Sequence, residues 1–172
     1  GEIRLTGLDP QSAQGDRAMV EILRDMGAEI RWEGETLVSR ASKLHGLRVD
    51  CAQVPDLVPI LAVAMAAAEG ESRITGAARL RIKESDRLNA MAAALTAAGA
   101  DVSELPDGLI ICGGKRLHAA KIEGCNDHRI VMAMTMASEI ADGELTITDA
   151  EATAKSAPAF WREFEHLGGL AR

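Results

Sequence analysis

The chain has 172 residues, a length that one hydrophobic core can hold together as a single domain. Its net charge of −7, from 19 Lys and Arg against 26 Asp and Glu, argues against a general nucleic-acid-binding surface. No run of about 18 uncharged apolar residues occurs, so no segment is expected to cross a membrane. Three cysteines, Cys51, Cys112 and Cys125, have no metal-ligand spacing and indicate a reducing, cytoplasmic environment.

Residues 1–43 predict a strand, a helix and a hairpin. The strand is "EIRLTGL", and the hairpin is "GAEIRWEGETLVSR". Residues 44–116 predict a complete β-α-β-α-β-β unit. Its strand "GLRVDCA" alternates, an Ala- and Met-rich helix follows from Asp56 to Glu69 and ends at Gly70, and "ESRITGA" alternates again. A second helix from Ser85 to Ala98 and two strands joined by a Pro-Asp-Gly turn complete the unit.

The segment from Leu44 aligns without a gap to the segment from Leu117, at an offset of 73 residues. Residues 117–172 therefore repeat the unit, but they stop after a helix from Ser156 to Leu167. The chain holds half a unit, a whole unit and a truncated unit. We expect it to be one part of a larger, two-domain protein.

Four predicted helix starts carry charged side chains. Pro59 is tolerated only in the first turn of a helix, so that helix must begin near Pro55, with Asp56 in its first turn. The other starts combine Ser or Asp caps with basic neighbours: Ser85 and Asp86 after Lys83 and Glu84, Asp127 before His128 and Arg129, and Ser156 after Lys155.

Basic residues are favoured at helix C-termini and oppose the helix dipole at N-termini. Their gathering at helix starts indicates that an anion binds there, held by free N–H groups and side chains together. If the repeated helices run the same way, the starts meet and bring Asp56 and Glu84 together as a candidate acid and base. Ordinary capping explains any single start equally well. His45 and His118 occupy matching repeat positions, which favours a structural role.

Four segments resemble signatures of one enzyme family. They read "VPDLVPILAVAMA", "RIKESDRL", "NDHRIVMA" and "TAKSAPAFW", and they are similar to those of 5-enolpyruvylshikimate-3-phosphate synthases, in the family's order. The resemblance covers essentially the whole chain and implies the C-terminal portion of that two-domain enzyme. It implies an α/β (α+β) fold: a pseudo-threefold domain of βαβαββ units with helices packed inside the sheets. The active site then lies between this domain and a missing N-terminal domain.

The resemblance also implies a reaction. The family transfers the enolpyruvyl group of phosphoenolpyruvate to the 5-hydroxyl of shikimate 3-phosphate. The reaction needs no metal or organic cofactor, and neither a nucleic acid nor a membrane is expected as a partner. Matching the motifs implies a base that contacts shikimate at Asp56, a lysine near shikimate 3-phosphate at Lys83, and a proton-transfer carboxyl at Glu84. The remaining matches are a neighbouring histidine, His128, and three phosphoenolpyruvate-binding cations, Arg87, Arg129 and Lys155.

Arg79 stands where some family members carry an Asn that contacts shikimate 3-phosphate, so no role is transferred to it. The resemblance implies that most contacts with shikimate 3-phosphate come from the missing domain. The chain alone is therefore expected to be inactive. UDP-N-acetylglucosamine enolpyruvyl transferases share the fold and the donor but lack the "KESDR" string. A non-catalytic anion-binding repeat module is a further alternative. RNA 3′-phosphate cyclases are disfavoured by the acidic charge and by the scarcity of aromatic residues.

Overall fold

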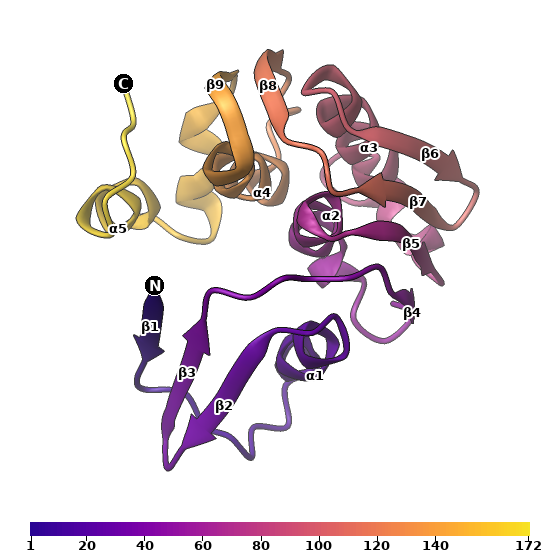
Figure 1. The fold of residues 1–172 in the computed structure, drawn as a ribbon. Coiled ribbons are helices and arrows are strands. Elements are labelled where there is room, and N and C mark those ends of the chain that lie inside the picture. Colours follow the sequence, from indigo (N-terminus) through magenta and orange to yellow (C-terminus); the bar gives the residue numbers. More distant parts are fainter.

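The computed structural model describes every residue from Gly1 to Arg172, and its strands form three separate sheets (Figure 1). The first sheet is antiparallel, with the order β1-β3-β2. Its elements are β1 (Glu2–Leu5), η1 (Gly15–Arg17), α1 (Ala18–Asp25), β2 (Glu29–Glu33) and β3 (Thr36–Arg40), where η denotes a 3-10 helix. The predicted strand, helix and hairpin of this region are confirmed.

The second sheet has the order β4-β5-β7-β6. β5 is parallel to β4 and antiparallel to β7, which is in turn antiparallel to β6. Its elements follow one another as β4 (Arg48–Asp50), η2 (Pro55–Leu57), α2 (Val58–Ala67), β5 (Gly70–Thr75), η3 (Ala78–Ile82), α3 (Arg87–Ala97), β6 (Asp101–Leu105) and β7 (Gly108–Gly113). This order confirms the predicted β-α-β-α-β-β unit, including the turn at Pro106 and Asp107 between β6 and β7.

The third sheet consists of the parallel strands β8 (Leu117–Ile122) and β9 (Ala141–Ile147), connected by α4 (His128–Ala137) and η4 (Ser138–Ile140). Val49 of β4 pairs with Ile74 of β5, and Ile122 of β8 pairs with Ile147 of β9 in the same register. The second pair lies 73 residues after the first, as the internal repeat predicts. The chain continues through η5 (Ala150–Lys155) and α5 (Phe160–His166).

Helices α2, α3 and α4 pack against one another and form the interior of the molecule. Seven of the ten residues of α2 are buried, so this helix is surrounded on all sides. Its Ala side chains let neighbouring backbones approach closely. In Figure 1 the second and third sheets lie outside these helices, which confirms the predicted packing of helices inside sheets. The longest helix, α3, has 11 residues, and no helix could span a membrane.

Two predicted helix boundaries are wrong. α2 ends at Ala67, because Ala68 is already extended, and Gly70 is the first residue of β5 rather than a helix terminus. α5 begins at Phe160 rather than Ser156, because the 3-10 helix η5 ends at Lys155 and residues 156–159 are not helical. Ser156 follows η5, so Lys155 lies at the C-terminal end of a short helix. Its charge is favourable at that end.

The histidines at matching repeat positions serve the fold. The His118 amide donates to Ala98 O at 2.9 Å at the end of α3, and the His45 amide donates to Met26 O at 2.8 Å at the end of α1. Gly99 has φ +93°, and a Cβ there would lie only 2.4 Å from His118 Nε2. Glycine is therefore required, since it alone combines this conformation with so close an approach.

Candidate active site

The centre of the candidate site is a buried ion pair between α3 and α4. Arg87 is the first residue of α3, and Asp127 is the N-cap of α4. Arg87 Nε donates to Asp127 Oδ2 at 2.8 Å, and Nη2 donates to Oδ1 at 3.2 Å. Their side chains are 1% and 0% exposed. This two-point contact fixes the plane of the guanidinium and ties the two helix starts together.

Asp127 has further partners that keep it ionised. Ser85 Oγ donates to Oδ2 at 2.9 Å, and the Arg129 amide donates to Oδ1 at 2.9 Å as a helix cap. Burial raises the pKa of Asp127, but the hydrogen bonds from Arg87, the Arg129 amide and Ser85 outweigh burial and lower the pKa below its ordinary value. Asp127 is therefore a fixed negative charge in the interior.

Asp56, in η2 before α2, gathers three cations. Its Oδ1 accepts from Arg87 Nη1 at 2.9 Å and lies 3.5 Å from Lys83 Nζ. Its Oδ2 lies 3.6 Å from Arg129 Nη2, and its backbone oxygen accepts from Arg129 Nη1 at 3.0 Å. The starts of α2, α3 and α4 thus meet at one point, as the sequence predicted. Asp56 and Arg129 occupy equivalent positions of the internal repeat.

Glu84 approaches the same guanidinium from a third side, where its Oε2 accepts from Arg87 Nη2. The side chains of Glu84 and Asp56 are 42% and 33% exposed, so both carboxylates reach solvent while Arg87 does not. Arg87 therefore holds two solvent-accessible carboxylates beside each other, and Lys83 lies next to that of Asp56. This arrangement can accept a proton at one carboxylate while the other donates one, provided their protonation states differ.

The cations at these helix starts have partners within the chain. Lys83, Arg87 and Arg129 face three carboxylates, those of Asp56, Glu84 and Asp127. Their charges balance within the chain. From the sequence, Asp127 is predicted only as a helix cap, because its contact with Arg87 spans 40 residues. The repeat offered one signal, since it places Asp56 and the oppositely charged Arg129 at equivalent positions.

His128 and Lys155 make no contact with the carboxylates of Asp56 and Glu84. His128 opens α4, and its Nδ1 is buried without a hydrogen-bond partner, 3.9 Å from Asp127 Oδ1. Lys155 does not contact Asp56 or Glu84. Its Nζ donates to Asn126 O at 2.5 Å and to Asn126 Oδ1 at 2.9 Å, in the loop that leads into α4.

Arg81, from the same basic segment, serves the fold instead. Its side chain donates to the carbonyl oxygens of Leu105 and Pro106 in the β6–β7 turn and to Glu104 and Asp86.

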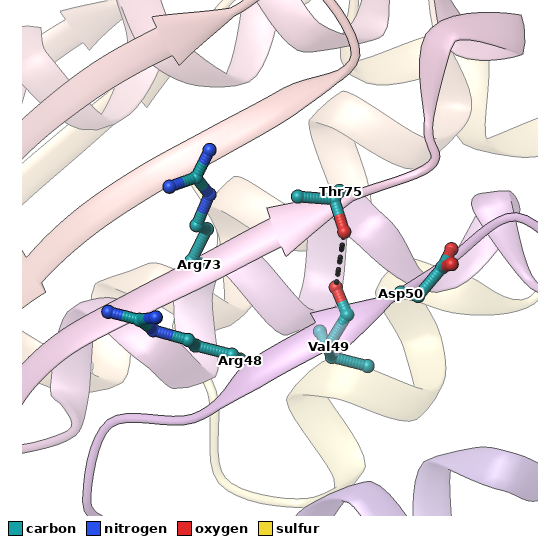
Figure 2. Close-up of a pocket in the computed structure, with 5 residues that line it drawn as sticks. All are labelled: Arg48, Val49, Asp50, Arg73 and Thr75. Carbon is teal, nitrogen blue, oxygen red and sulfur yellow. Dashed lines mark hydrogen bonds between the residues drawn. The ribbon is translucent and has the colours of Figure 1, made fainter.

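A second group of polar residues lies on β4 and β5, outside the cluster. Arg48, Asp50, Arg73 and Thr75 line a depression of about 330 Å³ with Val49 (Figure 2). Arg48 and Arg73 are register partners on adjacent strands, and Thr75 Oγ1 donates to Val49 O at 3.4 Å. The depression includes none of the residues matched to family motifs, and it offers a single carboxylate.

The chain has the fold of solved enzyme structures. The solved structure of NikO from Streptomyces tendae, described as an enolpyruvyl transferase, has a TM-score of 0.79 and covers 99% of this chain. At 20% identity, this likeness concerns the fold alone. EPSP synthase from Acinetobacter baumannii has a TM-score of 0.81 at 33% identity, with 98% of this chain and 42% of that chain covered. The fold is thus that of the enolpyruvyl transferases.

Sequence comparison then gives the family. The profile of EPSP synthase (3-phosphoshikimate 1-carboxyvinyltransferase) matches residues 1–164. The 3-phosphoshikimate 1-carboxyvinyltransferase of Clostridium novyi is 45% identical over 168 residues, which are 98% of this chain and 39% of that protein. That of Clostridium acetobutylicum is 46% identical over 169 residues, with the same coverage. The chain belongs to the EPSP synthase family and spans about two fifths of the length of these relatives.

Proposed function

We propose that this chain supplies one half of an interdomain active site that transfers the enolpyruvyl group of phosphoenolpyruvate to the 5-hydroxyl of shikimate 3-phosphate, with release of phosphate. Family membership supports the reaction class. The observation that carries the assignment to this site is the pair of exposed carboxylates, Asp56 and Glu84, on one buried guanidinium, Arg87. The rest of the protein, as in the longer relatives, would supply the other half.

The reaction needs a proton removed from one atom and a proton added to another. The acceptor hydroxyl must lose its proton as it attacks, while the methylene carbon of phosphoenolpyruvate gains one. We assign the first transfer to Asp56 and the second to Glu84, with the Lys83 ammonium 3.5 Å from the Asp56 carboxylate. Two carboxyl groups can divide these tasks when substrate binding makes their environments unequal. The environment of Asp56 can change on substrate binding, because the three cations that surround it can move toward an anionic substrate.

The anionic groups of the substrates need cations, and the geometry suggests how Arg87, Arg129 and Lys155 would provide them. The Arg87 guanidinium already contacts three carboxylates. A substrate carboxylate or phosphate would therefore replace Glu84 or Asp56 as its partner. Such an exchange would free a catalytic carboxylate when the substrate arrives. Arg129, whose side chain is 30% exposed, can turn toward a substrate more readily.

His128 adds a largely buried imidazole beside these charged residues. Its partnerless Nδ1 lies near the Asp127 carboxylate, which is fixed by Arg87. A proton on Nδ1 would be favoured by that negative charge, and this would leave Nε2 as the acceptor for a substrate proton. We therefore propose that His128 takes part in binding or proton transfer through Nε2.

A cytoplasmic location, in the shikimate pathway of aromatic amino acid synthesis, is part of the same proposal. All three cysteines are unpaired, which supports a reducing compartment. Burial, with a smaller contribution from the charge of Asp50, raises the pKa of Cys51 to about 11, so this thiol is unreactive at neutral pH. Cys112, in contrast, is exposed.

The test is phosphate release by the full-length protein and by the 172-residue chain. The full-length protein is expected to release phosphate only when both phosphoenolpyruvate and shikimate 3-phosphate are present. The isolated chain is expected to show none above a buffer control, because positioning two substrates supplies a large part of the catalysis. UDP-N-acetylglucosamine in place of shikimate 3-phosphate is the control acceptor. Turnover with that acceptor alone, or two-substrate turnover by the isolated chain, would contradict the proposal.

A further inference from the structure

We propose that Asn126 is the positioning residue for the Lys155 ammonium group, which it holds beside the start of α4 for contact with an anionic substrate. This inference rests on the proposed function, since it gives the cation Lys155 a defined place in that site. The contact itself stands on geometry. Lys155 Nζ donates to both the backbone oxygen and the side-chain Oδ1 of Asn126, at 2.5 and 2.9 Å.

Two acceptors on one residue determine where the ammonium lies. A lysine side chain has four rotatable bonds, and ordering it costs conformational entropy. An exposed lysine at the end of η5 would otherwise sample many positions. The loop that carries Asn126 continues directly into Asp127, His128 and Arg129, so the contact places the ammonium next to the start of α4.

The chemistry of these acceptors matters as much as their position. The other motif-matched cations, Lys83, Arg87 and Arg129, all face carboxylates, and the charges of that cluster balance. Lys155 contacts two neutral oxygens and forms no ion pair. Its charge is therefore not cancelled within the chain. Lys155 is thus the one motif-matched cation that need not give up a carboxylate partner to bind an anionic substrate, which makes its placement important.

The backbone around Asn126 is unusual in a way that supports this role. The non-glycine residues with left-handed backbone are Cys125 (φ +54°), Asn126 (φ +49°) and Asp149 (φ +55°). They lie together, because the Asn126 amide donates to Asp149 Oδ2 at 2.9 Å. Such conformations are unfavourable for non-glycine residues and persist where the surroundings impose them, often at functional sites. Here they turn the Asn126 carbonyl and side chain toward the same lysine.

The test compares Asn126→Gly with Cys125→Gly. Glycine accepts the left-handed conformation freely, so both variants relieve strain, but only Asn126→Gly removes an acceptor of Lys155. Asn126→Gly leaves the backbone acceptor in place, so a partial loss is expected. In the full-length protein we expect the KM for phosphoenolpyruvate to rise about tenfold in Asn126→Gly with kcat within about threefold, because one hydrogen bond to a charged group is lost. Cys125→Gly is expected to keep the wild-type KM.

A second readout follows the lysine directly in the 172-residue chain. Nitrogen-15 NMR of the lysine ammonium groups at low temperature should show a protected Lys155 signal in the wild type and in Cys125→Gly. Asn126→Gly should weaken or abolish it. A signal that survives unchanged in Asn126→Gly, an unchanged KM, or an equal rise in KM for Cys125→Gly would each overturn the inference. If the wild-type full-length protein does not use phosphoenolpyruvate, the proposed function fails, and the ammonium signal alone decides the Asn126 contact.

Discussion

Two networks of arginines and carboxylates differ in their burial. On the first sheet, three arginines contact three glutamates, and all six side chains are between 34% and 55% exposed: Arg4, Arg31 and Arg40 with Glu2, Glu29 and Glu33. At the starts of α3 and α4, Arg87 and Asp127 are 1% and 0% exposed. The first network covers a sheet, whereas the second joins the helix starts that form the candidate site.

A lowered pKa does not distinguish these networks. Hydrogen bonds from Arg40 and Arg4 lower the pKa of Glu2, and hydrogen bonds from Arg87 lower that of Asp127 against the opposing effect of burial. The difference appears when a partner is removed. An exposed carboxylate that loses its arginine is hydrated again, while a buried charge without a partner cannot be. Burial, rather than pairing, indicates which network the fold depends on.

The largest expected effect comes from breaking the buried network. Asp127→Asn leaves the Arg87 guanidinium buried without its two-point partner, and such a loss typically costs about 3–5 kcal/mol of unfolding free energy. Urea denaturation of the 172-residue chain measures it. Ser85→Ala is the matched control, since it removes only a hydroxyl from the same carboxylate and should cost about 1 kcal/mol. An Asp127→Asn variant no less stable than Ser85→Ala would show that the buried pair does not hold the helix starts.

The next effect concerns the exposed carboxylate of the same network. In the full-length protein, Glu84→Gln and Lys83→Met should each lower kcat about 100-fold or more, as expected for a positioned proton-transfer group and its neighbour. Both residues precede α3 and reach solvent, so the thermal midpoint should change little. Steady-state kinetics and a melting curve on each variant separate the two effects. Near-normal kcat in either variant would exclude that residue from the catalytic step.

Acid should distinguish the networks further. The folded-state pKa of Asp127 lies below its unfolded value of about 3.9, so the stabilisation by this carboxylate is complete above that pH and is lost as the pH falls through the folded pKa. Wild-type stability should therefore fall more steeply below about pH 4 than that of Asp127→Asn, which has no such group to titrate. Urea midpoints between about pH 3 and pH 7 test this. Parallel curves for the two proteins would assign the acid response to other groups.

The smallest effect is expected on the first sheet. Glu2→Gln removes the charge that contacts Arg4 and Arg40, but both arginines are already in water. We expect no measurable change in the urea midpoint at physiological salt, because exposed ion pairs contribute little and are screened. Any loss comparable to that of Asp127→Asn would contradict the distinction between the networks.

Local rules predicted much of the fold. Alternation located the strands, and Pro59 located the start of α2. Asp86 accepts from the Asn89 amide as the cap of α3, as the Ser85-Asp86 signal indicated. The repeat predicted equivalent strands 73 residues apart, and the structure pairs β4 with β5 and β8 with β9 in matching register. All of these depend on residues close in sequence or on the period of the repeat.

The candidate site was only partly predictable. The meeting of three helix starts followed from the repeat, but the partners of each cation did not. Arg87 contacts Asp56 and Asp127 across 31 and 40 residues, and no local pattern encodes such pairs. Lys155 was expected at a helix start and instead contacts Asn126, because it ends η5 and α5 begins only at Phe160. The catalytic roles themselves stay predictions.

The central claim, that the helix starts form an anion site, is tested most directly by titrating phosphoenolpyruvate into the isolated chain while following amide NMR shifts. The shifts should centre on Arg87, Arg129 and Lys155, indicate a Kd of roughly millimolar because the other half of the site is absent, and fade with added salt. The Glu2→Gln chain should respond identically. Shifts confined to the C-terminal ends of α2, α3 and α4, or none at high millimolar ligand, would contradict the claim.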